Sequence, residues 1–119
     1  MQLTPLLVLR CDAGTATSEI AVRLRDAGYL IAKVHDDETA LAIAAADHVD
    51  GYVVDLPVIA AVRFVRRLGE KVPALVVSAS PEAVHRACGA ATVSTYAMDD
   101  LVSATDRMLI DHELRATAS

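Results

Sequence analysis

Short runs of branched apolar residues alternate with segments of helical periodicity along almost the whole chain. The apolar runs cover residues 6–9, 30–34, 52–54, 75–77 and 92–96. Strands that are apolar on both faces are typical of parallel sheets, whose two sides are both covered by helices. The alternation therefore predicts an α/β fold with a single doubly wound, five-stranded parallel sheet.

Helix signals fill the gaps between these runs. Apolar residues at helical spacing and helix-start residues predict helices over 19–27, from Asp36 or Asp37, from Pro57, over 80–88 and from Asp99. In the last helix, the residues expected to face the core are Leu101, Val102, Thr105, Met108 and Leu109. We expect one domain over 1–115, followed by a frayed tail at 116–119.

The composition argues against several classes of function. Hydrophobic residues make up 54% of the 119 residues, which is ample for an aliphatic core, and aromatic residues only 3%. Bases stack on aromatic side chains and phosphates need a basic surface, so these few aromatics and a net charge of -5 argue against nucleic-acid binding. No apolar run has the length of a membrane span, and no signal peptide precedes the first strand. Because Cys11 and Cys88 have no CxxC partner, we expect a cytoplasmic protein without membrane contacts.

Polar residues follow the apolar runs, at the carboxyl ends of strands where parallel sheets place their sites. They include Arg10, Cys11, Asp12, Asp55, Ser78 and Tyr96. Asp55 ends an apolar run just before a helix, so its carboxylate is expected to face this edge of the sheet. Position alone leaves two roles open for it. It could accept a phosphoryl group or bind a metal ion, or it could cap the following helix.

Several segments resemble response-regulator receiver domains, and they occur in the family's order. The segment Asp50-Gly51-Tyr52-Val53-Val54-Asp55-Leu56 resembles the family's third strand, with an acidic residue entering it and the phospho-acceptor Asp leaving it. Residues 24–29, 36–41 and 89–90 resemble the end of its first helix, the start of its second helix and the approach to its fifth strand. The resemblance covers nearly the whole chain and implies a flavodoxin-like sheet with the strand order 2-1-3-4-5.

The resemblance also implies a phosphorylation pocket, which this sequence matches only in part. In the family, two acids after the first strand and the acceptor Asp hold Mg²⁺, and the ion screens the repulsion between a carboxylate and an incoming phosphate. Here the two acid positions fall on Cys11 and Asp12, and a thiol is a poor ligand for so hard an ion. Arg10 adds a cation that is expected to occupy part of the space that the metal needs.

The remaining positions depart from the family as well. Ser78 fits the position of the phosphate-binding hydroxyl, but the position of the family's lysine falls on Tyr96, and no lysine follows Lys71. The segments after Asp55 and between Ser78 and Gly89 are short for the family. These departures indicate a degenerate receiver, or pseudo-receiver: a non-enzymatic, two-component signalling domain without Mg²⁺ or another cofactor, in which the Asp55 position is not used.

Such a domain is expected to act through protein contacts. The family's usual contact surface is formed by its fourth helix, fifth strand and fifth helix, and it would serve a partner protein, a covalently linked output domain or a second copy. On the last helix, Asp106 and Arg107 are expected to face the partner. An alternative keeps Asp55, with Asp12 and Ser78, as a weak, metal-assisted phospho-acceptor in a phosphorelay.

A different resemblance leads to a third interpretation. Cys11, Gly14, Thr17 and Ser18 resemble the phosphocysteine loop of IIB components of sugar phosphotransferase systems. In that loop a strand-end thiolate takes the phosphate and backbone N–H groups at a helix N-terminus cradle it. Asp12 would place an anion inside this cradle. A small buried thiol without chemistry is the remaining interpretation of Cys11.

Overall fold

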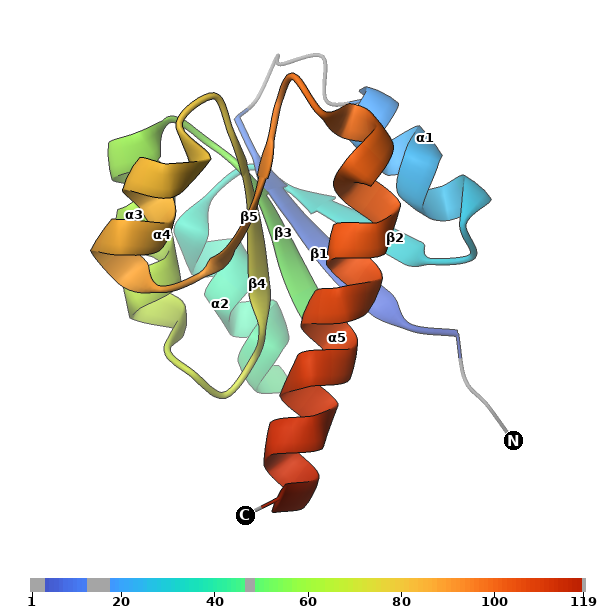
Figure 1. Cartoon of the computed structure of the whole chain (residues 1–119). Coiled ribbons are helices and arrows are strands. Elements are labelled where there is room, and N and C mark those ends of the chain that lie inside the picture. Colours follow the sequence, from blue (N-terminus) through green and yellow to red (C-terminus); the bar gives the residue numbers. More distant parts are fainter. Residues whose placement is uncertain (1–3, 13–17, 47–48, 119) are drawn as a thin grey trace.

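A computed structural model of the chain describes residues 4–12, 18–46 and 49–118. Strands and helices alternate along it (Figure 1). The elements are β1 (Leu6–Cys11), α1 (Ser18–Asp26), β2 (Leu30–Val34), α2 (Asp37–Ala46), β3 (Gly51–Asp55), α3 (Val58–Leu68), β4 (Ala74–Ser78), α4 (Pro81–Cys88), β5 (Ala91–Ser94), the short 3-10 helix η1 (Met98–Asp100) and α5 (Leu101–Ala118).

The strands form one parallel sheet with the order β2-β1-β3-β4-β5. This confirms the predicted fold class and strand order. The chain runs outward from β1 to β2 and then returns to the other side of β1 with β3. Because the winding direction reverses there, the carboxyl ends of β1 and β3 border the crevice where such sheets bind ligands.

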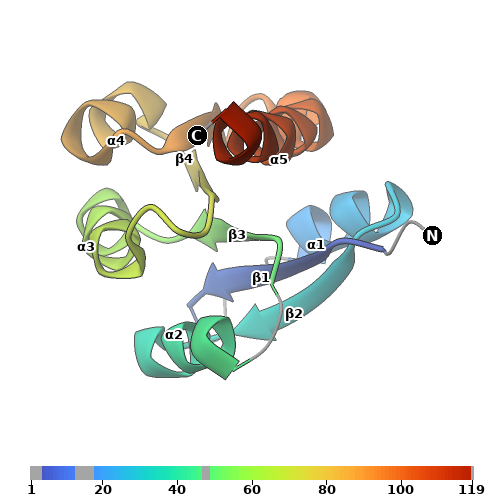
Figure 2. The same ribbon diagram turned by 90° about the horizontal axis from the view of Figure 1, so that it is seen from below.

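Helices cover both faces of the sheet (Figure 2), which explains the continuous apolar runs in the strands. Successive strand residues point to opposite faces. Leu7, Leu9 and Cys11 of β1 therefore pack toward α1 and α5, whereas Val8 packs toward α2, α3 and α4. On the second face the Tyr52 hydroxyl is satisfied, since it donates a hydrogen bond to the carbonyl oxygen of Ala40 (2.6 Å).

The two segments that the sequence marks as short, after Asp55 and between Ser78 and Gly89, are short in the structure. Only Leu56 and Pro57 separate β3 from α3. α4 is a helix of 8 residues, and Gly89 ends it with a φ of 73°, a left-handed conformation that favours glycine. Asp36 is the residue that caps α2, because its Oδ1 accepts a hydrogen bond from the N–H of Thr39 (2.7 Å).

Two boundaries differ from the prediction. β5 ends at Ser94, so the strand predicted over 92–96 is too long. Its partner strand β4 ends at Ser78, which pairs with Ser94, and the chain then turns as the N–H of Ala97 donates to the carbonyl oxygen of Ser94 (3.0 Å). Asp99 does not cap the last helix. It lies in η1, and its exposed carboxylate forms an ion pair with Arg23 of α1 (3.0 Å).

α5 carries the predicted apolar stripe and extends past the sheet at its C-terminal end (Figure 1). Leu101, Thr105 and Met108 are buried, and Val102 and Leu109 pack against the same core. The helix continues to Ala118, so the predicted domain limit at Arg115 lies within it and stays a prediction. Within the described part of the chain, no helix has both the length and the apolar character needed to cross a membrane.

Candidate functional site

Asp55 lies at the carboxyl end of β3, where the sequence places the candidate site. Strand pairing sets Asp55 opposite Cys11, and β4 ends nearby at Ser78. The N-cap position of α3 is Pro57, and no side chain makes a capping hydrogen bond there. Asp55 therefore does not cap the following helix, and its carboxylate belongs to the crevice.

A small pocket of about 290 Å³ opens beside this carboxylate and is called the Asp55 pocket below. Its lining comprises Asp12, Asp55, Leu56, Pro57, Val58, Val77, Ser78, Ala79, Ser80 and Thr95. The structure thus brings Asp12, Asp55 and Ser78 together, as expected. The Ser78 hydroxyl already has a local partner, because its oxygen accepts a hydrogen bond from the N–H of Ser80 (3.0 Å).

The pocket contains like charges. Burial raises the pKa of Asp55 above its ordinary value, and the negative charge of Asp12 raises it further. Among the described residues, no Lys or Arg forms an ion pair with Asp55. The ionised form of Asp55 is therefore less favourable here than in water, and an incoming phosphate would meet two carboxylates.

The structure places Tyr96 outside this pocket, contrary to the expectation. Its side chain is 87% exposed, and its N–H donates to the Ser94 hydroxyl in the turn that follows β5 (3.1 Å). Thr95 lines the pocket instead, because its N–H donates to the carbonyl oxygen of Ser78 (3.0 Å) and so holds it against β4. The cause is the early end of β5, which moves the chain away from the sheet before Tyr96.

Arg10 is also absent from the pocket lining. Its guanidinium donates from Nε to Asp37 Oδ1 (2.7 Å) and from Nη1 to the carbonyl oxygen of Cys11 (2.9 Å). The same group lies 6.0 Å from the centre of the Phe64 ring on α3. Arg10 therefore faces α2 and α3, and the expectation that it fills the space of a metal ion beside Asp55 does not hold.

Arg10 belongs to a group of alternating charges that we call the α2–α3 ion cluster. Its members are Arg10, Asp37, Glu38 and Arg67. Asp37 pairs with both Arg10 and Arg67 (2.7 and 3.4 Å), and Arg67 also reaches Glu38 (2.7 Å). Each buried or half-buried charge of the cluster thus has an opposite charge beside it, as the cost of burying an ion requires.

Cys11 is fully buried in the core beneath α1 and α5. Its Sγ lies 3.6 Å from His35 Nδ1 and 4.0 Å from the carbonyl oxygen of Val34. A thiol without exposed surface is not open to a phosphoryl donor. The observed strand order is the one that the receiver resemblance implies. Gly14 and Thr17, which that interpretation needs, lie outside the described residues.

The residues of the pocket do not fit the Mg²⁺ ion that the resemblance implies. Mg²⁺ needs a near-octahedral set of well-placed oxygens. Asp12 and Asp55 supply carboxylates, but the other acid position holds the buried thiol of Cys11. In the described ranges, His, Cys, Asp and Glu side chains form no group of three that could hold a metal.

No protein-family model and no curated protein sequence matches the chain, but solved structures do. The signal receiver domain of an HD domain-containing protein from Pseudomonas fluorescens has a TM-score of 0.81 at 14% identity, over 98% of this chain and 95% of that chain. For the signal receiver domain of a modulated diguanylate cyclase from Desulfovibrio desulfuricans, the TM-score is 0.78 at 20% identity, over 95% and 99%. A Vibrio cholerae chemotaxis protein has a TM-score of 0.70 at 23% identity, over 89% and 99%. The chain has the receiver-domain fold. Identities this low show the fold alone.

Within this receiver fold, three polar residues have a position or a partner that the sequence did not predict. Asp50 Oδ2 accepts a hydrogen bond from the N–H of Leu6 (2.7 Å) and so joins the starts of β1 and β3. Thr95 lines the Asp55 pocket, and Asp37 pairs with Arg10. Only Asp37 had a signal in the sequence, because a charged residue within an apolar strand requires an opposite charge nearby.

Proposed function

We propose that the chain is an atypical receiver-like signalling domain that acts through protein contacts, and that its signalling state does not depend on phosphorylation of Asp55. The observation that carries the proposal is the lining of the Asp55 pocket, whose described residues include a second carboxylate and hydroxyls but no Lys or Arg. A phosphoryl group brings about −1.5 to −2 charges at neutral pH. On Asp55 it would gain no ion pair from this lining.

The lack of an ion pair matters because a phosphoryl group must bind one conformation better than the other in order to act as a switch. A ligand shifts a two-state equilibrium only as far as its affinity differs between the two states. The two groups that would sense a phosphoryl group are uncharged, so neither gives it an ion pair. Tyr96, at the position of the family's lysine, faces solvent, and the Ser78 hydroxyl is held by the N–H of Ser80. This arrangement favours a domain with one fixed surface.

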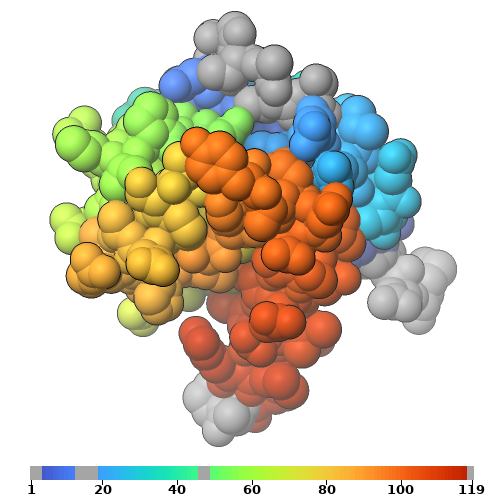
Figure 3. Space-filling view, turned by 45° about the horizontal axis from the view of Figure 1, so that its top comes forward, coloured from blue at the N-terminus to red at the C-terminus, as the bar shows by residue number. Residues whose placement is uncertain are grey.

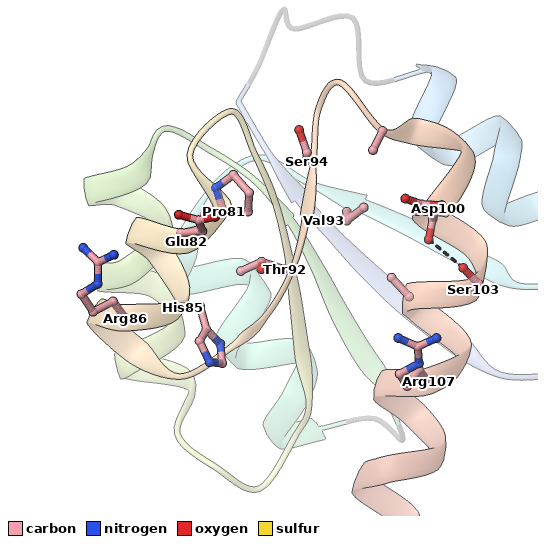
Figure 4. A pocket seen from close by; sticks show the side chains of 12 residues that line it. Pro81, Glu82, His85, Arg86, Thr92, Val93, Ser94, Asp100, Ser103 and Arg107 are labelled. Carbon is pink, nitrogen blue, oxygen red and sulfur yellow. Dashed lines mark hydrogen bonds between the residues drawn. The ribbon is translucent and has the colours of Figure 1, made fainter.

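The contact surface that we propose is a groove between α4, β5 and α5, called the α4–α5 groove below (Figure 4). It has a volume of about 870 Å³. Its lining comprises Pro81, Glu82, His85, Arg86, Thr92, Val93, Ser94, Ala97, Asp100, Ser103, Ala104 and Arg107. In Figure 4, His85 and Arg107 stand on the two helices with Thr92 of β5 between them. Figure 3 shows α4 and α5 side by side on this face.

Charges of both signs line this groove, with Glu82 and Asp100 beside Arg86 and Arg107. Such a pattern supports selection of a partner by charge complementarity more than by apolar area. Arg107 is exposed and belongs to the lining, as expected of a partner-facing residue. Asp106, the other residue expected to face a partner, has a contact within the domain, because its carboxylate accepts a hydrogen bond from the Tyr29 hydroxyl. The occupant is a partner protein, a linked output domain or a second copy of the domain.

A second candidate function rests on one observation: Asp55, Asp12 and Ser78 share a pocket. They are the residues that a weak phospho-acceptor would use. The lack of a Lys or Arg among the described lining residues opposes it, since the incoming phosphate brings more negative charge to a pocket that already holds two carboxylates.

The test replaces Asp55 and Arg107 separately in the protein as it occurs in the cell. We expect Asp55→Asn to bind its native partner and signal like the wild type, whereas Arg107→Glu weakens both. Arg25→Glu, a matched charge reversal on the exposed side of α1, is expected to change neither. Loss of signalling by a folded Asp55→Asn variant would contradict the proposal and favour the phospho-acceptor.

A further inference from the structure

A second groove lies between α3 and α4, and we call it the α3–α4 groove. It has a volume of about 610 Å³. Its lining comprises Val58, Ile59, Val62, Arg63, Arg66, Arg67 and Ala87. It shares no residue with the α4–α5 groove and only Val58 with the Asp55 pocket. A function of this groove is therefore independent of the one proposed above.

The floor of the groove is apolar and open. Val62 lies four residues after Val58 and three after Ile59, so both residues share a face of α3 with it. Ile59 is 74% exposed, the largest exposed fraction of any large aliphatic side chain in the described residues. Isolated exposed apolar residues are ordinary, but an exposed Ile that lines a groove together with Val58 and Val62 is typical of a binding surface.

Arginines form the wall of the groove. Arg66 is fixed in place, because its Nη2 donates to the carbonyl oxygen of Ala87 in the last turn of α4 (3.0 Å). Arg67 is held by the α2–α3 ion cluster. Arg63 is exposed and has no ion-pair partner among the described residues. In a chain with a net charge of -5, this face is thus a local concentration of positive charge.

We propose that the α3–α4 groove binds an acidic amphipathic helix of a partner protein. A groove between two helices accepts a third helix by the packing of side-chain ridges into grooves. Apolar side chains of the partner at positions i, i+3 and i+4 cover Val58, Ile59 and Val62, and its flanking carboxylates pair with Arg63 and Arg66. Charge complementarity selects the acidic class, since basic helices meet the arginine wall.

The same observations disfavour the other anionic macromolecules. Nucleic acids bind to broad basic surfaces and to aromatic side chains, but no aromatic residue lines the groove and the chain is acidic overall. An anionic membrane needs a wide basic and apolar surface. Here Glu38 lies next to Arg67 at the edge of the groove, and Glu82 lies at the start of α4.

The test uses the whole chain and two fluorescein-labelled, 16-residue synthetic helices, a length of about four turns. Both helices carry the same Leu and Ala stripe, and their flanks carry Glu in one and Lys in the other. Fluorescence anisotropy is expected to show saturable binding of the Glu helix, at least about tenfold tighter than that of the Lys helix. The Glu helix is also expected to bind more weakly as salt is added.

Two variants with matched controls locate the binding site. We expect Ile59→Ala and Arg63→Glu each to weaken binding of the Glu helix at least about fivefold, because anchors at the centre of an interface carry most of its affinity. The controls Val22→Ala and Arg25→Glu change an exposed apolar and an exposed basic residue of α1, and should leave affinity unchanged. Circular dichroism checks that each variant is folded.

Three results would overturn the proposal. The first is no saturable binding of the Glu helix by the folded chain. The second is binding that Ile59→Ala and Arg63→Glu leave as tight as the controls do. The third is binding of phosphatidylserine vesicles that Ile59→Ala abolishes while the Glu helix does not compete, which would assign the groove to a lipid surface instead.

Discussion

The carboxyl edge of the sheet holds two groups of carboxylates, and among the described residues they differ in how many cations line them. In the α2–α3 ion cluster, Asp37 and Glu38 alternate with Arg10 and Arg67. In the Asp55 pocket, the described residues that line it beside Asp12 and Asp55 include no Lys or Arg. Arg10 of the cluster and Asp12 of the pocket lie two residues apart at the end of β1, so the two groups begin close together in the chain.

The difference arises from the face of the sheet toward which each side chain points. A strand alternates its side chains between the two faces of the sheet. Arg10 therefore faces α2 and α3 and is not one of the described residues that line the Asp55 pocket. In the cluster, each charge has an opposite charge beside it. In the pocket, burial and the negative charge of Asp12 raise the pKa of Asp55.

The largest expected effect is a loss of stability when the α2–α3 ion cluster loses one of its charges. Replacing Arg10 by Met leaves the half-buried Asp37 carboxylate with only the longer contact to Arg67. We expect Arg10→Met to lower the free energy of unfolding by about 2–4 kcal/mol, because breaking a buried ion pair leaves a poorly compensated charge. Urea unfolding followed by circular dichroism measures this loss.

The control for this change is Arg25→Met, which removes an exposed arginine of α1 and should alter stability by no more than about 0.5 kcal/mol. The double variant Arg10→Met with Asp37→Asn removes both charges and should recover part of the loss. Equal costs for Arg10→Met and Arg25→Met would mean that the cluster contributes no more than a surface ion pair.

A smaller effect of opposite sign is expected in the Asp55 pocket. Asp55→Asn removes the like-charge contact with Asp12, so it should stabilise the protein at neutral pH by roughly 0.5–1 kcal/mol. The folded-state pKa of Asp55 is raised, so ionisation costs stability as pH rises from the ordinary Asp value of about 3.9 through the raised pKa. The gain should therefore vanish when the pH falls below that ordinary value.

Urea unfolding of the wild type and of Asp55→Asn from about pH 3, below the ordinary carboxyl pKa, to about pH 8 checks the sign of this difference. Asp26→Asn, an exposed carboxylate of α1, is the matched control and should show no such difference. A wild type that is more stable than Asp55→Asn at neutral pH would reveal a favourable partner for the Asp55 carboxylate.

The smallest expected effect is that of Mg²⁺. With only Asp12 and Asp55 as carboxylate ligands, we expect no saturable NMR shifts around Asp55 at low-millimolar Mg²⁺. Asp55→Asn should give the same titration as the wild type. Clear saturation in the wild type that the Asn variant lacks would favour the weak phospho-acceptor.

Much of the fold was predictable from the sequence, because strands buried on both faces must be apolar throughout. Leu30–Val34 is the observed β2, and Gly89 ends α4 as its conformational freedom suggests. The position of Asp55 at a strand end also followed from its place after Val54. These features depend on neighbouring residues, which a sequence displays directly.

The residues that were misplaced depend on distant parts of the chain. Tyr96 was expected at a strand end, but the length of β5 is set by β4, which ends at Ser78. Asp99 was expected to cap a helix, but Arg23 of α1 draws its carboxylate away. The direction of Arg10 was misjudged because it depends on how α2 sets Asp37 over the end of β1. No local pattern reports such contacts.

The most direct test of the central claim is an NMR comparison of the whole chain before and after treatment with acetyl phosphate and Mg²⁺. The amides to follow are those of Asp55, of Ser94 and Arg107 in the α4–α5 groove, and of Thr95 between them. We predict that wild type and Asp55→Asn give the same spectra, with no change in the groove. Shifts at Asp55 that spread to Ser94 and Arg107 in the wild type, and are absent from Asp55→Asn, would contradict the claim and show a working phosphorylation switch.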